Sequence, residues 1–343
     1  MNPTERALLN NYQRNFPLTP RPYLAIAREL GCDESMVVTL LKRFIRTGVI
    51  SRIGPVFRPN TVGVSTLAAM AVPAARLQQV ADAVSACPAV NHNYEREHRF
   101  NLWFVVNAPT RSDRNAVLAG IEAETGLSVM SLPLERDYHI DLGFDIDFDG
   151  AAVPRMDRPA AAPAAAAALR SGGQLPTDLV AAIQGGLAVV GTPFARIASE
   201  TGLSEGDVIN LIGARVRTGV IKRFGIVVRH RELGYRANAM CVWDLPEERI
   251  DELGKRIAAM PYVTLCYRRR RCLPDWPYNL FCMIHGKDRA TVLGQVRELA
   301  ARFELGGVPG EVLFSGRCFK QRGAYYRQPH TPLTRRRAQA VYG

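Results

Sequence analysis

The sequence has no long apolar run, no paired-cysteine motif and only six histidines in 343 residues. Without an uninterrupted apolar stretch of about 20 residues, a membrane-spanning helix is not expected. The first residues also lack the apolar core of a secretory signal. The seven cysteines form no C-x-x-C pair, a usage typical of reduced thiols rather than of disulfides. We therefore expect a globular protein of the cytoplasm.

The excess positive charge lies in the second half of the chain. The formal net charge is +12, yet residues 1–150 hold 15 Lys/Arg against 16 Asp/Glu, and the remaining residues hold 29 against 16. An anionic partner should therefore be bound mainly by the second half. Nucleic acid and a polycarboxylate both fit this charge distribution.

Two segments of the chain are copies of each other. Residues 31–63 align without a gap on residues 202–234, and both contain the pattern R-T-G-V-I-x-R-x-G-x-V-x-R. A shared pattern of this length indicates an internal duplication. The Ala/Pro-rich stretch AAVPRMDRPAAAPAAAAALRSGGQL between the copies is typical of a linker.

Each copy begins with the elements of a winged helix-turn-helix. In the first copy, apolar periodicity predicts a helix containing Leu8 to Phe16, a second over Pro22–Leu30, and a third capped by Asp33. A strand over Val49–Phe57 follows as the wing. In the second copy, Ser204 begins the helix that matches the third one.

After each wing the pattern becomes strand–helix–strand–strand–helix–strand, which is the split βαβ, ferredoxin-like plan. The predicted fold class is therefore α+β, a tandem duplication of a winged helix-turn-helix followed by a ferredoxin-like βαββαβ domain. The plan resembles that of the Lrp/AsnC transcription regulators. The expected divisions are winged helix-turn-helix domains at 1–62 and 176–234, ferredoxin-like domains at 63–150 and 235–328, a linker at 151–175 and a tail at 329–343.

The predicted recognition helices do not resemble DNA-reading helices. Their first turns carry Asp33-Glu34-Ser35 in one copy and Ser204-Glu205-Gly206-Asp207 in the other, where Arg, Lys, Asn or Gln usually contact bases. Carboxylates at these positions suit a helix N-terminus but would be repelled by phosphates. We therefore expect no DNA partner.

The stretch Val90–Phe104, VNHNYEREHRFNLWF, is unusually polar for a strand. With a period of two residues, His92, Tyr94, Arg96 and His98 point to one face. That face would combine groups that transfer protons near neutral pH with a fixed cation. A solvated edge strand, protected from aggregation by its charges, is the alternative interpretation.

The second copy keeps part of this pattern. In VTLCYRRRRCLPDWPYNLF, Tyr94 and Arg96 recur as Tyr267 and Arg269, whereas Leu265 replaces His92. Four consecutive arginines and a Trp-Pro-Tyr insertion are added. Guanidinium groups bind carboxylates through paired hydrogen bonds. The two copies together would suit a large, flat, polyanionic ligand held between them.

The segments NHNYEREHRFNLWF, LCYRRRR, PDWPYNLFCMIHG and FSGRCFKQRGAYY resemble the siroheme decarboxylase family, in the fused NirD–NirL form associated with haem d1 biosynthesis. The resemblance covers nearly all of both halves except the linker and the tail. It implies that siroheme loses CO2 from its C12 and C18 acetates to give 12,18-didecarboxysiroheme. It also implies no cofactor beyond the iron of the substrate, no membrane partner, and either a homodimer or association with related decarboxylase subunits.

The candidate site follows from this resemblance. His92 and His98 stand where the family has its histidine pair, so both are expected to be essential, and either could be an axial contact to the substrate iron. An extended strand would separate their Cα atoms by about 20 Å, so either a turn begins near His98 or the two have separate tasks. Expected substrate-binding residues are Tyr94, Arg96, Trp103, Tyr267, Arg268, Arg269, Arg270, Arg271 and His285; His139 is a weaker candidate, and His230 and His330 are expected at the surface.

The two halves are expected to form an internal pseudo-dimer, because ferredoxin-like domains of this kind often pair through their sheets. Replacement of His92 by Leu265 in the second copy predicts one active site per chain. Two other functions stay open at this point: an Lrp/AsnC-like DNA-binding regulator, and a tetrapyrrole carrier that leaves its ligand unchanged.

Overall fold

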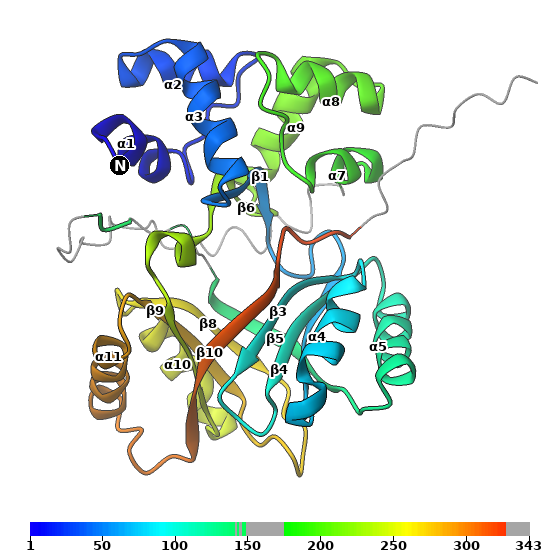
Figure 1. The fold of residues 1–343 in the computed structure, drawn as a ribbon, viewed down its shortest axis with the longest axis vertical. Helices are drawn as coiled ribbons and strands as arrows, with labels where there is room; N and C mark the ends of the chain where they lie inside the picture. Colours follow the sequence, from blue (N-terminus) through cyan, green and yellow to red (C-terminus); the bar gives the residue numbers. More distant parts are fainter. Residues whose placement is uncertain (141–142, 144–145, 149–174, 327–343) are drawn as a thin grey trace, which may run out of the picture.

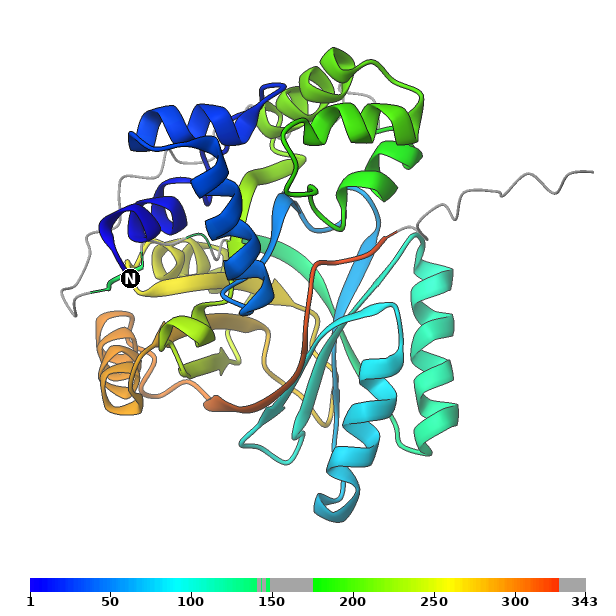
Figure 2. The ribbon, with the colours of Figure 1, turned by 45° about the horizontal axis from the view of Figure 1, so that its top comes forward.

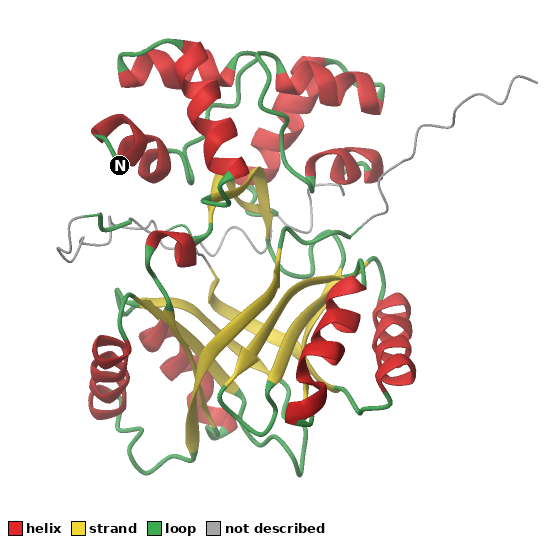
Figure 3. Ribbon diagram, viewed as in Figure 1, coloured by secondary structure: helices red, strands yellow, loops and turns green. Residues whose placement is uncertain are grey.

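A computed structural model describes residues 1–140, 143, 146–148 and 175–326. The predicted linker at 151–175 lies outside the described residues except for Leu175, and so does the predicted tail at 329–343. Helical domains occupy one end of the molecule and a β-barrel with flanking helices occupies the other (Figures 1 and 3). Within the described ranges, every helix is too short or too polar to cross a bilayer, and all seven cysteines are free thiols.

Two winged helix-turn-helix units form the helical end. The first consists of α1 (Pro3–Asn11), α2 (Pro22–Leu30), α3 (Glu34–Arg46) and β1 (Ile50–Phe57), and the second of α7 (Thr177–Ile183), α8 (Pro193–Thr201), α9 (Glu205–Arg217) and β6 (Ile221–Val228). The wings β1 and β6 pair antiparallel in a two-stranded sheet. The wings therefore join the two units.

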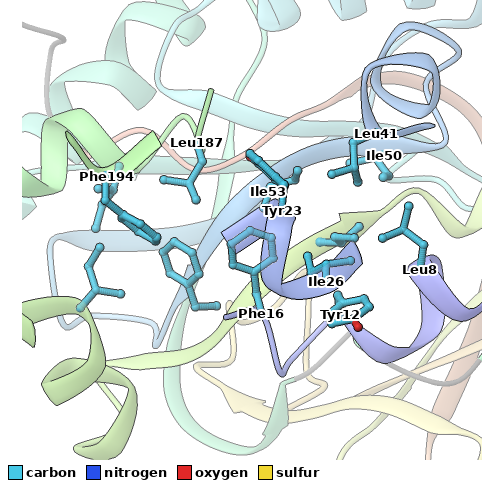
Figure 4. Close-up of a cluster of buried hydrophobic side chains, with 14 of the residues drawn as sticks. Leu8, Tyr12, Phe16, Tyr23, Ile26, Leu41, Ile50, Ile53, Leu187 and Phe194 are labelled. Atoms are coloured by element: carbon cyan, nitrogen blue, oxygen red, sulfur yellow. The ribbon is translucent and has the colours of Figure 1, made fainter. Parts of the chain in front are cut away.

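One hydrophobic core runs through both units. The ring of Phe224 in the second unit lies 6.0 Å from the ring of Phe16 in the first unit. It also lies 6.3 Å from the ring of Phe194 in its own unit. Tyr23 donates its hydroxyl proton to the carbonyl of Ala188, 3.0 Å away. Figure 4 shows residues of both units in this cluster, which makes the helical end a single body.

Two four-stranded antiparallel sheets form the barrel. The first has the order β3-β4-β2-β5 and the second the order β8-β9-β7-β10, as in a ferredoxin-like domain. The strands are β2 (Val64–Met70), β3 (Val90–Arg96), β4 (Leu102–Ala108), β5 (Met130–Ile140), β7 (Ala237–Trp243), β8 (Val263–Arg269), β9 (Leu280–Gly286) and β10 (Gly310–Gln321). Pairing of β10 with β3 and of β5 with β8 closes the eight strands. The expected internal pseudo-dimer is thus confirmed, in the form of a closed barrel.

Helices cover the outside of the barrel (Figure 2). They are α4 (Leu77–Ala86) and α5 (Arg111–Thr125) in the first half and α10 (Glu247–Ala258) and α11 (Arg289–Arg302) in the second, with short 3-10 helices η1 (Ala74–Arg76) and η2 (His230–Leu233) in the connections. Equivalent contacts recur in both halves: Asn101 bonds both backbone groups of Val72, and Asn279 does the same to Leu245. These contacts confirm the duplication.

Some local predictions were wrong. β3 ends at Arg96 rather than His98, because the chain turns where the Arg96 N–H donates to the carbonyl of Asn101. α1 ends at Asn11, so Phe16 is buried in the connection that follows it.

The predicted caps differ between the two copies. Asp33 occupies the N-cap of α3 without accepting a helix N–H through its side chain, whereas the Ser204 hydroxyl accepts the N–H of Asp207. Only the second copy therefore has the predicted side-chain cap.

Candidate functional site

The alternation predicted for β3 holds as far as Arg96. His92 and Tyr94 lie opposite Val105 and Trp103, two residues of the apolar cluster inside the barrel. Asn93, with the opposite parity, donates from its side chain to α4 on the outside of the barrel. His92, Tyr94 and Arg96 therefore face the barrel interior.

The end of the barrel remote from the winged helices is filled by aromatic side chains. Trp103 and Trp276 lie 5.0 Å apart, and Tyr267 stacks on Phe281 at 5.7 Å. Trp103 and Tyr267 are only 2% and 6% exposed. The structure therefore places these two predicted ring-binding residues in the hydrophobic core, where a macrocycle could reach them only by displacing that packing.

His98 lies in the turn after β3, at this filled end. Its Nδ1 accepts the N–H of Phe100 at 2.9 Å, and its Nε2 lies 2.8 Å from Oε2 of Glu311 at the start of β10. Tyr278 donates to the other oxygen of Glu311. Burial lowers the pKa of His98, partly offset by Glu311. His98 thus connects the turn after β3 in the first half to Glu311 of the second half and, through Glu311, to Tyr278. His98 and His92 lie towards opposite ends of β3.

The run of four arginines does not act as one surface. Arg268 pairs with Glu135 and Glu247, and Arg271 pairs with Asp244 and Glu247. Arg270 is exposed. A shallow surface cavity of about 300 Å³ lies over the run, and these same glutamates line it. Two of the predicted carboxylate-binding residues are therefore already neutralised by the protein's own carboxylates.

Arg269 is the inward-facing member of the run. Its guanidinium lies 4.6 Å from the ring centroid of Tyr267 and donates to the carbonyl of Leu132 in the other half. Arg96, its counterpart in the first copy, likewise donates to the carbonyl of Leu313 in the other half. Burial lowers the pKa of both guanidinium groups, that of Arg96 to about 10.

Arg52 and Arg229 lie near His92 at the end of the barrel that faces the winged helices. His92 lies opposite Gln321 on β10, and Arg229 donates to the Gln321 carbonyl at 3.3 Å. Arg52, from the wing β1, is close enough to His92 to disfavour its protonation. A hydrogen bond and charge interactions link this set, which we call the mouth cluster: Arg52, His92, Tyr94, Arg96, Arg229, Arg231, His285 and Cys318.

Four arginines of the mouth cluster lack a carboxylate partner among the described residues: Arg52, Arg96, Arg229 and Arg231. Each also has a buried guanidinium N–H with no hydrogen-bond acceptor in the described part of the chain. Leaving a cation uncompensated below the surface costs several kcal/mol. An arrangement of this kind is favourable when an external anion supplies the missing charge.

Both histidines of the mouth cluster are held neutral. Burial, with a smaller contribution from Arg52, lowers the pKa of His92 to about 4. Burial, with a smaller contribution from Arg96, lowers the pKa of His285 to about 4. Burial raises the pKa of the Tyr94 phenol. Carboxylates brought near the arginines would reverse the charge contributions and favour protonated imidazole.

The remaining histidines differ in setting. His230, expected at the surface, is 6% exposed in η2 because Tyr235 packs against it, and burial lowers its pKa. His139 lies on β5 opposite Cys266. His330 lies outside the described residues. The surface prediction for His230 was therefore wrong.

Sequence reasoning missed Arg52, Arg229 and Arg231 as site residues. Arg52 and Arg229 belong to the duplicated R-T-G-V-I-x-R-x-G-x-V-x-R block, which we interpreted only as evidence of duplication. The available signal for these site residues was the recurrence of arginines in the wing. The wing strand runs towards the other domain. Arg231 follows in η2 with no sequence signal of its own.

The first turns of the recognition helices α3 and α9 carry carboxylates, and Arg43, Arg46, Arg215 and Arg217 lie in their last turns. Glu34 in the first turn of α3 forms an ion pair with Arg21, and the carboxyl group of Asp207 in α9 bonds the Ser204 hydroxyl. These first turns are acidic and engaged with their own chain. The expectation of no DNA partner stays a prediction. Within the described residues, His, Cys, Asp and Glu form no cluster of three or more suited to a metal ion.

Comparisons with known proteins agree with this architecture. The AsnC-like ligand binding domain model matches residues 61–139 and 232–320. The siroheme decarboxylase NirDL-like HTH domain model matches residues 5–50 and 177–221. The siroheme decarboxylase NirDL subunit of Paracoccus denitrificans is 45% identical over 327 residues, covering 94% of this chain and 97% of the relative.

Two solved structures have the same overall arrangement. A crystal structure of the siroheme decarboxylase NirDL matches with a TM-score of 0.64 and 26% identity, covering 95% of this chain and 94% of that one. A second, of NirDL in co-complex with an iron-uroporphyrin III analogue, matches with a TM-score of 0.62 and 26% identity over 94% of each chain. With its duplicated plan, its closed barrel and a relative of this identity along nearly its whole length, the chain belongs to the siroheme decarboxylase NirDL family.

Proposed function

We propose that this protein removes CO2 from the C12 and C18 acetates of siroheme, giving 12,18-didecarboxysiroheme, and that the mouth cluster is the site. The observation that carries the proposal is the set of four arginines without carboxylate partners among the described residues, one of which, Arg52, lies close enough to the neutral, partly accessible His92 to disfavour its protonation. Siroheme carries eight carboxylates. A polyanion of this kind supplies the charges that Arg52, Arg96, Arg229 and Arg231 lack.

Binding and proton supply are coupled in this site. Carboxylates within about 4–6 Å raise the pKa of an imidazole by about 1–3 units each. Binding therefore changes His92 from neutral towards imidazolium at the moment when a proton donor is needed. Arg52, which disfavours the charge on His92 in the free protein, is neutralised by the same ligand.

The reaction needs one proton for each CO2. The bond between the acetate methylene and its carboxylate breaks, CO2 leaves, and the electron pair stays on the methylene carbon, where the conjugated macrocycle delocalises it. The imidazolium of His92 then gives its proton to that carbon, which becomes a methyl group. Water returns a proton to His92. Such proton transfer contributes about 10²–10⁴-fold to rate, and the iron belongs to the substrate.

We propose that His98 acts separately from His92. Its two ring nitrogens hold the turn after β3 and the start of β10, and Arg96 ends the same strand. His98 is therefore a positioning residue that fixes Arg96 and joins the halves. The ring of Trp276 in the second half, whose centroid lies 5.5 Å from that of His98, supports this role.

The test is anaerobic incubation of the protein with siroheme, followed by mass analysis of the extracted tetrapyrrole. We expect loss of two CO2 by the wild type and a slowing of about 10²-fold or more in His92→Asn. Arg268→Gln, which alters an arginine already paired on the surface, is the matched control and should keep the wild-type rate. Siroheme that is bound but unchanged would instead indicate a carrier, and failure to bind would contradict the proposal.

The setting of the reaction is also part of the proposal. We place the protein in the cytoplasm, in haem d1 biosynthesis, consistent with its seven free thiols. We propose that it needs no cofactor other than the iron of siroheme. It works as a homodimer or beside related decarboxylase subunits.

A further inference from the structure

A short segment that follows β10, Arg322–Tyr326, passes between the two ends of the molecule, and we call it the strap. Figures 1 and 2 show it in red, where it leaves β10 and runs along the boundary between the barrel and the helical end. Its residues close the segment FSGRCFKQRGAYY, and none of them is in the mouth cluster. The strap therefore has no task in the site as built so far from the mouth cluster alone.

Both ends of the strap are fixed by backbone N–H groups. The N–H of Arg322 donates to the carbonyl of Asn91 on β3 at 2.8 Å. The N–H of Tyr326 donates to the side-chain oxygen of Gln184, the residue that ends α7, at 2.8 Å. The buried ring of Tyr326 meets the ring of Phe57, the last residue of the wing β1, edge-on with 6.2 Å between centroids. The strap thus connects the barrel to both winged units.

The middle of the strap lies against Arg52. A Cβ atom added to Gly323 would lie 2.8 Å from Nη1 and 2.9 Å from Cζ of Arg52. A Cβ atom added to Gly186, in the second winged unit, would lie 2.9 Å from the Cβ of Arg52. The side chain of Arg52 therefore has one glycine against its stem and another against its guanidinium group, and a side chain at either position would move it.

The guanidinium group of Arg52 is held without an anion from the described part of the chain. Its Nη2 donates to the carbonyl of Pro55 at 2.9 Å, and its buried Nε–H has no acceptor among the described residues. Burial lowers the pKa of Arg52, and the phenols of Tyr325 and Tyr326 partly offset this effect. Packing by the strap and one hydrogen bond therefore fix this cation before any ligand arrives.

Orientation matters for an arginine that binds a carboxylate, because the two parallel hydrogen bonds require the planar group to face the ligand. A side chain that is already held also loses less freedom on binding, which contributes about 3- to 10-fold in affinity. We propose that the strap holds Arg52 in the orientation that receives a carboxylate of the tetrapyrrole, and that Gly323 is the positioning residue.

This inference rests on the proposed function and deepens it, because it gives the winged helix-turn-helix units a task in substrate binding. The first unit supplies Arg52 on its wing, and the second supplies Gly186 beside the stem of that arginine. The two units also supply Phe57 and Gln184, which anchor the end of the strap. Both units thus complete the substrate site from outside the barrel.

Substrate binding and the strap are then coupled in both directions. If the strap in its place raises the affinity for the ligand by a given factor, the bound ligand favours the strap in its place by the same factor. Amide hydrogen exchange measures such local opening. The backbone amides of residues 322–326 should therefore exchange about 3- to 10-fold more slowly when the ligand is bound.

The first test is an optical titration of the full-length protein with iron-uroporphyrin III. Gly323→Ala should weaken binding by about 3- to 10-fold, because the three atoms nearest to the added methyl group all belong to the guanidinium group of Arg52. Gly191→Ala, whose methyl group meets no atom within 4 Å among the described residues, is the matched control and should bind as the wild type does. In the Arg52→Gln background, Gly323→Ala should have no further effect, since glutamine lacks the atoms that the methyl group displaces.

The second test is hydrogen exchange of the wild type and of Arg52→Gln, each with and without saturating iron-uroporphyrin III. The ligand should slow exchange in residues 322–326 of the wild type by the same factor by which Gly323→Ala weakens binding. In Arg52→Gln the ligand should leave the exchange of these residues unchanged. This measurement needs no substitution in the strap, so it tests the inference even if Gly323→Ala does not fold.

The outcomes separate this inference from the proposed function. If the wild type does not bind iron-uroporphyrin III, or if Arg52→Gln binds it as tightly as the wild type, the proposed site itself fails. If Arg52→Gln weakens binding but Gly323→Ala does not, Arg52 needs no strap, and the inference fails while the proposed function stands. An equal loss of affinity from Gly323→Ala with and without Arg52 would also overturn the inference, because the strap would then act only as a connection between domains.

Discussion

Binding of a polycarboxylated tetrapyrrole should be accompanied by proton uptake at the mouth cluster. In the free protein the pKa of His92 and that of His285 are about 4, so at pH 6.5 roughly 0.3% of each imidazole is protonated. If ligand carboxylates restore each pKa to about 6.5, each imidazole becomes about half protonated. The expected uptake at pH 6.5 is therefore about one proton per ligand.

The sign of the pH dependence follows from this uptake. Because the complex holds more protons than the free protein, affinity should rise as pH falls from about 8 to about 5.5. Isothermal titration with iron-uroporphyrin III in two buffers of different ionisation enthalpy measures the uptake directly. The His92→Asn variant should take up about half as many protons as the wild type, and the double variant with His285→Asn should take up almost none.

Two results would refute this reasoning. Binding without proton uptake would mean that the carboxylates do not approach the two imidazoles. Uptake that persists unchanged in the double variant would assign the protons to other groups, and the mouth cluster would lose its role in proton supply. Either result can be obtained without catalytic turnover, so it is independent of the rate measurements.

Three further predictions concern the same features. Arg52→Gln should weaken siroheme binding by about 10–100-fold, because a charge-assisted hydrogen bond contributes about 1.5–3 kcal/mol, whereas Arg268→Gln should leave the titrated affinity unchanged. The free protein should lose up to about 3 kcal/mol of unfolding free energy for each of His92 and His285 as pH falls from about 6.5 to 4, since unfolding restores the ordinary histidine pKa. Urea titrations at several pH values measure this loss of unfolding free energy. The same loss in the double Asn variant would contradict the assignment to these two histidines. Trp276→Ala should lower the unfolding free energy by about 3–5 kcal/mol, and an unchanged urea midpoint would show that the filled end of the barrel is not part of the core.

Local pattern was enough to predict the order of elements. The period of apolar residues placed α2 at its observed bounds, Pro22–Leu30, and the alternation in β3 identified His92 and Tyr94 as facing one side. These features depend on neighbours within a few residues. A single sequence contains that information directly.

Features that depend on the meeting of distant segments were missed or misjudged. The run from Arg268 to Arg271 was the most obvious cationic feature of the sequence, yet its flanking members pair with Asp244, Glu135 and Glu247. Those carboxylates are 21 or more positions away in the chain or belong to the other half. Spacing alone cannot tell a neutralised arginine from one that awaits a ligand.

The histidine pair illustrates the same limit. The sequence left open whether a turn began near His98, and the structure places that turn directly after Arg96. His98 then meets Glu311, more than 200 positions further along the chain, because closure of the barrel joins β10 to β3. Barrel closure itself had no local signal, since it is a property of two sheets rather than of one strand.

The most direct test of the account is a crystal structure of this protein with iron-uroporphyrin III bound under anaerobic conditions. We predict that the macrocycle lies at the winged-helix end of the barrel, with carboxylates on Arg52 and Arg231 and with His92 facing the ring. A macrocycle bound instead over Arg268 and Arg271 on the outer surface would contradict the account, because the site would then lie at the arginine run rather than at the mouth cluster.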